Sequence, residues 1–281
     1  MSLIVFLLII ASAFLHALWN FAAKKVSGNF QVIYLSLVMA SALLLPFLFI
    51  LPAAEVFNPR PLPYLLATGT IHAVYFFALG RAYAYGDISS SYPLARGTGV
   101  GGTALAAYWL LQEGMTSLGL LGVAAISIGT LLIGLTHSQP TGGLKGCFFA
   151  LLVGTMIVAY SLIDKMGVGI THPVVYAFGL WFIAALWLTP YVLLKKRPEL
   201  SRAWRDHKGS SLLIGAGSLS TYLLILFIFR IAPVGYVVAL RETAVAIGAL
   251  MGFVFLREKP ATLKIAGIIL IVIGMMAIKM A

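Results

Sequence analysis

Charged residues are scarce in this sequence, and their scarcity excludes a water-soluble surface. Only 10% of the 281 residues are Asp, Glu, Lys or Arg, whereas 61% are hydrophobic. The mean hydropathy of +1.03 is likewise high for a soluble domain. The composition therefore indicates an integral membrane protein whose solvent is the lipid bilayer.

Cysteine and recognisable catalytic motifs are also missing or rare. The single cysteine, Cys147, excludes a disulfide framework and a cysteine-based zinc site. The sequence has no His-Glu-x-x-His, no Gly-x-Ser-x-Gly and no phosphate-binding glycine-rich loop followed by Lys. We therefore predict neither an enzyme nor an ATP-driven pump, and we expect no cofactor, metal site or catalytic residue.

The formal net charge of +11 does not indicate a nucleic-acid partner. The basic residues lie mainly between apolar segments, where they orient a protein in the membrane. The densest basic cluster, at 195–208, offers only Trp204 for stacking on bases. The expected partners are the lipid bilayer and a small-molecule substrate.

Ten apolar segments are long enough to cross a bilayer, which takes about 20 residues each. They cover residues 3–22, 31–51, 62–83, 88–112, 116–136, 143–163, 172–194, 211–231, 235–256 and 261–279. Lipid cannot satisfy backbone polar groups, and the alternation of a barrel strand is absent, so each segment must be a helix. We predict an all-α integral membrane protein with ten transmembrane helices, one long loop at 195–209 and a retained first helix.

The distribution of Lys and Arg predicts an orientation. Thirteen of these residues flank the loops after helices 1, 3, 5, 7 and 9, and four flank the other side. The positive-inside rule places the richer side in the cytosol, with both termini outside. We expect a multi-pass protein of the bacterial cytoplasmic (inner) membrane.

The chain repeats itself at an offset of 145 residues. The matching pairs are Arg96 with Arg241, Thr98 with Thr243, Glu113 with Glu258, Gly122 with Gly267 and Gly129 with Gly274. Two repeats of five helices have opposite membrane orientations because five is odd. We expect residues 1–138 and 139–281 to form two inverted five-helix repeats around a central cavity.

With these features the chain resembles the drug/metabolite transporter superfamily, specifically its EamA family. The resemblance rests on the ten helices in two halves, on Trp19 followed by lysines, and on two small-residue-rich helices that end in Glu113 and Glu258. It implies a basket of helices around a cavity, with helices 3, 4, 8 and 9 among the main walls. The small four-helix multidrug exporters of this superfamily use a glutamate in helix 1, which here has no acid; this disfavours export of drug cations.

Arg96 and Arg241 are the strongest candidates for a binding site. At 1.5 Å per residue they lie about 12 Å and about 9 Å inside their helices. An arginine that faces lipid costs at least about 2.5 kcal/mol. Both are therefore predicted to face the cavity, where a guanidinium suits carboxylate, phosphate or phosphonate oxygens.

Glu242 is interpreted as the only acid clearly inside a helix. It would form a salt bridge with one arginine, or accept a proton and couple transport to it. If the salt bridge forms, the other arginine is left for an anionic group.

Further polar and aromatic residues are predicted to line the cavity: His16, Trp19, Asn20, His72, Tyr75, Tyr92 and Tyr222. His16 and His72 are interpreted either as packing residues or as substrate-contacting, protonatable groups. Glu113 and Glu258 are predicted to be structural, each capping a helix or pairing with a base.

The sequence thus predicts a secondary transporter that moves a small polar, anionic or zwitterionic metabolite by alternating access. A flippase for a lipid-linked head group is an alternative. An intramembrane enzyme is another, and would need a nucleophile beside a base, for instance Ser89 to Ser91 near His72. The coupling ion, and whether the chain is a monomer or a homodimer, are left open.

Overall fold

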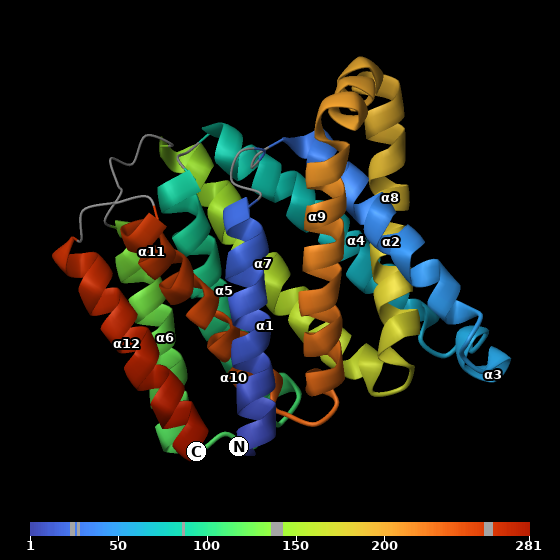
Figure 1. Cartoon of the computed structure of the whole chain (residues 1–281). Helices are drawn as coiled ribbons and strands as arrows, with labels where there is room; N and C mark the ends of the chain where they lie inside the picture. The colour runs from blue at the N-terminus through green and yellow to red at the C-terminus, as the bar shows by residue number, and fades with distance from the viewer. Residues whose placement is uncertain (23–25, 27–28, 86–87, 136–142, 256–260) are drawn as a thin grey trace.

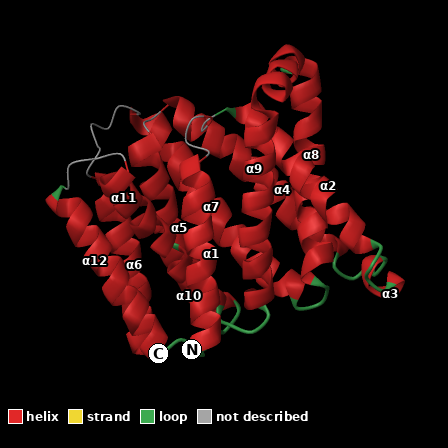
Figure 2. Cartoon of the chain, viewed as in Figure 1, coloured by secondary structure: helices red, strands yellow, loops and turns green. Residues whose placement is uncertain are grey.

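The protein is a bundle of helices (Figures 1 and 2). The computed structural model describes residues 1–22, 26, 29–85, 88–135, 143–255 and 261–281, and these contain no strand. The helices are α1 (Leu3–Ala22), α2 (Phe30–Leu48), α3 (Ala53–Val56), α4 (Leu62–Tyr85), α5 (Ile88–Leu110), α6 (Ser117–Leu135), α7 (Gly143–Val168), α8 (Pro173–Lys195), α9 (Arg197–Phe229), α10 (Val234–Arg241), α11 (Thr243–Phe255) and α12 (Thr262–Met280).

The predicted transmembrane architecture is confirmed. Nine spans in the described part of the chain are long and apolar enough to cross a membrane, with α10 and α11 forming one span, Val234–Phe255. The tenth predicted segment is α5, which is 23 residues long. Both termini lie at the same end of the bundle, as an even number of spans requires (Figure 1).

The outer surface carries large apolar side chains. Leu105, Trp109 and Ile273 are 61%, 73% and 56% exposed, respectively. Buried positions instead include hydroxyl and charged side chains such as Thr103 and Glu242. This inversion of the soluble pattern is expected where lipid is the solvent and the helices pack through small or hydrogen-bonding residues.

Helices α6 and α12 pack closely through two pairs of glycines. A Cβ at Gly122 would lie 2.7 Å from the Gly274 carbonyl oxygen, and one at Gly267 would lie 2.6 Å from that of Gly129. The order of the contacts shows that the two helices run antiparallel. The same glycines are partners in the predicted repeat, so an exchange of the two helices maps each contact onto the other.

The predicted loop at 195–209 is wrong, because most of this segment is helical. Helix α9 begins at Arg197 and leaves helical geometry only at His207, where φ is −131° and ψ is 17°. Pro198 falls in the first turn, where its missing N–H breaks no hydrogen bond. Hydropathy marks the edge of the apolar layer, and the helix continues beyond it.

Two other boundaries also differ from the prediction. Helix α7 continues to Val168 and therefore contains Asp164, which is fully buried. The interpretation of Glu242 as the only acid inside a helix is wrong for this reason. At Glu242 itself the helix tightens, since its N–H donates to Ala239 O (2.9 Å) and Val245 N–H donates to Glu242 O (2.8 Å).

Candidate functional site

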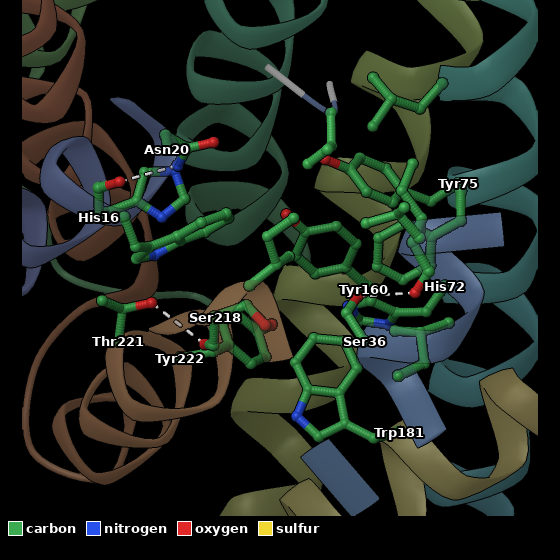
Figure 3. A pocket seen from close by; sticks show the side chains of 18 of the residues that line it. His16, Asn20, Ser36, His72, Tyr75, Tyr160, Trp181, Ser218, Thr221 and Tyr222 are labelled. Atoms are coloured by element: carbon green, nitrogen blue, oxygen red, sulfur yellow. Dashed lines mark hydrogen bonds between the residues drawn. The ribbon is translucent and has the colours of Figure 1, made fainter. Parts of the chain in front are cut away.

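A cavity of about 210 Å³ lies among α1, α2, α4, α5, α7, α8, α9 and α10. Its wall is largely apolar and aromatic, with a few polar groups, which is typical of a small-molecule site. Figure 3 shows His16 and Asn20 on one side and His72, Tyr75 and Trp181 on the other. The lining residues are His16, Trp19, Asn20, Val26, Val32, Ile33, Ser36, Leu37, His72, Tyr75, Phe76, Leu79, Arg96, Tyr160, Trp181, Ile214, Ser218, Thr221, Tyr222 and Arg241.

The structure brings most of the predicted site residues to this cavity. Eight of the ten line it: His16, Trp19, Asn20, His72, Tyr75, Arg96, Tyr222 and Arg241. Glu242 lies behind the wall, bound to Arg96. The side chain of Tyr92 lies outside the described residues.

Arg96 forms a two-point ion pair with Glu242. Its Nε donates to Oε2 at 3.1 Å, and its Nη2 donates to Oε1. Glu242 has no exposed surface and Arg96 is 7% exposed. The salt-bridge interpretation of Glu242 is therefore confirmed, and α5 is tied to the turn between α10 and α11.

Arg241 has a different environment, although it is the partner of Arg96 in the predicted repeat. Its guanidinium carbon lies 5.2 Å from the ring centroid of Tyr222, a distance typical of a cation–π contact. No carboxylate of the described residues lies within ion-pairing distance of it. A positive charge thus borders the cavity with an aromatic face as its neighbour and no ion-pair partner in the part of the chain that the structure describes.

Asp164 is a buried acid that the sequence analysis missed. Its Oδ1 accepts from Thr68 Oγ1 at 2.5 Å and from Tyr176 OH at 2.9 Å, and its Oδ2 accepts from Tyr222 OH. Three hydroxyl donors suit an ionised carboxylate, which accepts and does not donate. The apolar segment ends at 163, so Asp164 resembled a residue at the membrane edge.

His72 stands at the centre of an aromatic cluster that forms one wall. Its ring centroid is 4.4 Å from that of Tyr160, 5.8 Å from Trp181 and 6.0 Å from Tyr222. Its Nδ1 lies 2.9 Å from Thr68 O and 3.1 Å from Thr68 Oγ1. Trp181 was not among the predicted site residues, because an aromatic residue in an apolar helix gives no signal of which way it faces.

Three polar ring atoms in the cavity wall have no hydrogen-bond partner among the described residues. They are His16 Nδ1, Trp19 Nε1 and Trp181 Nε1. Buried polar atoms are nearly always paired, so three unpaired atoms in one cavity wall are unusual. His16 packs edge-on against Trp19 with ring centroids 5.0 Å apart.

At the end of the bundle where α7 and α9 finish, polar contacts around Lys165 hold the helices together. Its Nζ donates to Phe229 O at 2.5 Å and to Ala232 O at 2.9 Å, and lies 3.5 Å from Glu113 Oε1. Glu113 also accepts from Val234 N–H, the first residue of α10, at 2.7 Å. The predicted structural role of Glu113 is confirmed, whereas Glu258 lies outside the described residues.

Comparison with known proteins supports the resemblance stated from the sequence. Residues 144–280 match the EamA-like transporter family. A crystal structure of another protein superposes on this chain with a TM-score of 0.77, covering 100% of this chain and 98% of the other. Their sequence identity is 15%, so this likeness shows the fold alone. No curated protein matches the sequence.

Proposed function

We propose, from the match of residues 144–280 to the EamA-like transporter family, that this chain is a secondary transporter for a small polar metabolite with an anionic group. The membrane-spanning fold and the family match support a carrier of the drug/metabolite type. The cavity supports a small substrate, which would reach it from one side of the membrane at a time.

The unpaired Arg241 is the observation that carries the anionic part of the proposal. A buried or half-buried guanidinium without a counter-ion is unfavourable in a low-dielectric site. A carboxylate or phosphate group of the substrate would supply the missing charge and match the fork of donors. Arg96 already has Glu242, so Arg241 is the main anchor and Arg96 a secondary contact in the wall.

The lining indicates from which end the substrate would enter. It extends from Arg241 past Trp19 and Asn20 at the end of α1 to Val26, and to Ile214 on α9. This end also carries the basic helical segment at 197–208 (Figure 1). The positive-inside rule places such a segment in the cytosol, so the cavity would face the cytosol of a bacterial inner membrane.

Alternating access requires the opposite end to be closed in this state. The contacts of Lys165 and Glu113 with the segment between α9 and α10 provide such a closure. The two inverted repeats, 1–138 and 139–281, would exchange conformations when this end opens. Proton coupling would fall on the charge pair or on another buried acid, and is tested by imposing a pH gradient.

The alternative of an intramembrane enzyme finds less support. Thr68 is hydrogen-bonded to both His72 and Asp164, so a hydroxyl, an imidazole and a carboxylate lie together. However, Thr68 is fully buried and does not line the cavity, so a substrate could not reach its hydroxyl. The side chains of Ser89 to Ser91 lie outside the described residues. A flippase would require entry of a lipid tail between helices, and it would bind lipid-linked head groups in preference to soluble anions.

The proposal is tested by screening the purified protein for thermal stabilisation by small carboxylates, phosphates, phosphonates, amino acids and organic cations. Ligands with an anionic group should raise the unfolding temperature, and Arg241→Ala should remove the effect. Stabilisation by cations alone, or by lipid-linked head groups and not by soluble anions, would contradict the proposal.

A further inference from the structure

Two residues of the cavity lining, His72 and Arg241, both lie beside the ring of Tyr222. The imidazole ring of His72 lines the cavity, and its Nε2 has no hydrogen-bond partner among the described residues. The rings of His72 and Tyr222 are 6.0 Å apart, and Tyr222 also lies 5.2 Å from the Arg241 guanidinium. A small molecule in this cavity would therefore contact both a cation and one nitrogen of an imidazole.

The proton positions around Thr68 decide what that nitrogen does. The Thr68 hydroxyl donates its only proton to Asp164 Oδ1, at 2.5 Å. It can therefore only accept from His72 Nδ1, and the Thr68 backbone oxygen, 2.9 Å from Nδ1, is also an acceptor. Nδ1 must then carry a hydrogen, and an uncharged imidazole that donates through Nδ1 accepts through Nε2.

Asp164 has no contact with the cavity and affects it through this hydrogen bond. Asp164 is fully buried, and the hydroxyls that surround it belong to α4, α8 and α9. If Asp164 did not accept the Thr68 proton, that hydroxyl could donate to His72 Nδ1 and compete with the Thr68 backbone oxygen, which favours a hydrogen on Nδ1. The carboxylate therefore removes the one competing donor, and it favours the same tautomer as the Thr68 backbone oxygen.

We propose that the Thr68 backbone oxygen, together with Asp164 acting through the Thr68 hydroxyl, makes His72 the hydrogen-bond acceptor of the site, so that the preferred anions also carry an amino or hydroxyl donor. This inference rests on the proposed function, since it presumes that Arg241 holds the anionic group. Asp164 is a positioning residue, and His72 is the group that distinguishes substrates.

The first test compares small anions that differ only in the donor. Alanine, lactate and propionate share three carbons and a carboxylate, and phosphoethanolamine and ethyl phosphate form a corresponding pair. Apparent affinities come from thermal-shift titrations of the full-length protein. The donor-bearing members should bind at least about tenfold more tightly, as expected for one hydrogen bond at a buried site. His72→Phe should remove this preference, and His207→Phe, on the kink of α9, is the control.

The second test separates the tautomer from a structural role of Asp164. Asp164→Asn should reduce the preference for alanine or lactate over propionate, because an amide that donates to Thr68 Oγ1 turns the Thr68 hydroxyl proton toward His72 Nδ1. Adding Thr68→Val removes that donor, so the double variant should regain the preference. Thr70→Val, an exposed position two residues along α4, is the matched control. If Asp164 had only a structural role, the double variant would show a weaker preference for donor-bearing anions than Asp164→Asn.

The outcomes distinguish this inference from the function on which it rests. Equal affinity for donor-bearing and plain anions in the wild type, with binding still lost in Arg241→Ala, would overturn the role of His72 and leave the anion site intact. Anion binding that persists unchanged in Arg241→Ala would contradict the proposed function itself. Failure of Thr68→Val to restore the preference in folded Asp164→Asn protein would overturn the role of Asp164.

Discussion

Arg96 and Arg241 occupy matching positions in the predicted repeat, yet their surroundings differ. Arg96 is held by Glu242 through two contacts, whereas Arg241 lies against the ring of Tyr222 with no described carboxylate within ion-pairing distance. The position that matches Glu242 at an offset of 145 is Gly97, so the repeat provides one acid for its pair of arginines. The difference separates an arginine that holds helices together from one that is available for a ligand.

The largest expected effect comes from breaking the ion pair. Arg96→Ala leaves Glu242 buried without a partner and should lower the free energy of unfolding by about 3–5 kcal/mol. Replacing both residues, with Arg96→Met and Glu242→Leu, should recover most of this loss because no buried charge remains. Unfolding in detergent micelles measures both variants. If Arg96→Ala were as stable as the wild type, the ion pair would not stabilise the bundle.

Removing Arg241 should weaken anion binding and leave stability nearly unchanged, the opposite of what is expected for Arg96. Arg241→Ala should leave the unfolding temperature of the free protein nearly unchanged and weaken anion binding about 10-fold to 100-fold, the range for charged hydrogen bonds. Arg241→Lys keeps the positive charge but loses the paired N–H donors of the guanidinium, so its affinity for anions should lie between those of the wild type and Arg241→Ala. Titration of ligands found in the screen gives these values. Strong destabilisation by Arg241→Ala would contradict the contrast with Arg96.

The glycine contacts between α6 and α12 test whether matching positions can also be equivalent. Gly122→Ala and Gly267→Ala each place a Cβ within 2.8 Å of a backbone oxygen of the other helix. Each should cost about 1–3 kcal/mol of stability, and the two costs should be similar. Gly248→Ala, where no atom lies within 4 Å of the added Cβ, is the control and should be neutral. Clearly unequal costs would show that the repeats have diverged here as well.

The smallest effect is expected at the closed end of the bundle. Glu113→Gln removes a charge that lies 3.5 Å from Lys165 and should weaken the closure by about 1 kcal/mol or less. The cavity should then be open toward the end that carries the basic segment 197–208 for a smaller fraction of the time. The readout is thiol labelling of Ser218→Cys in a Cys147→Ser background, and its rate should fall by up to about fivefold. Faster labelling would mean that Glu113 does not hold this end closed.

The sequence predicts the ten helices and both arginines for the same physical reason. Lipid excludes unpaired backbone groups and lipid-facing charges, so long apolar segments and isolated arginines have few interpretations. The sequence left the partner of Glu242 open between the two arginines, and the structure pairs it with Arg96. Adjacent helical residues point about 100° apart, which is consistent with Glu242 facing away from Arg241.

Other parts of the site could not be predicted from the sequence. Asp164 was missed because its helix continues past the apolar segment, and Trp181 because an aromatic residue in a membrane helix can face lipid or cavity equally well. The absence of a described carboxylate beside Arg241 depends on how α7, α9 and α10 pack. Only the three-dimensional arrangement shows that Asp164 accepts hydrogen bonds from three hydroxyl groups.

The most direct test of the central claim is substrate counterflow in proteoliposomes, using an anion that stabilises the purified protein. The wild type should exchange labelled for unlabelled ligand, and Arg241→Ala should reduce exchange to the level of protein-free vesicles while Gly248→Ala does not. Exchange by Arg241→Ala at the wild-type rate would contradict the account.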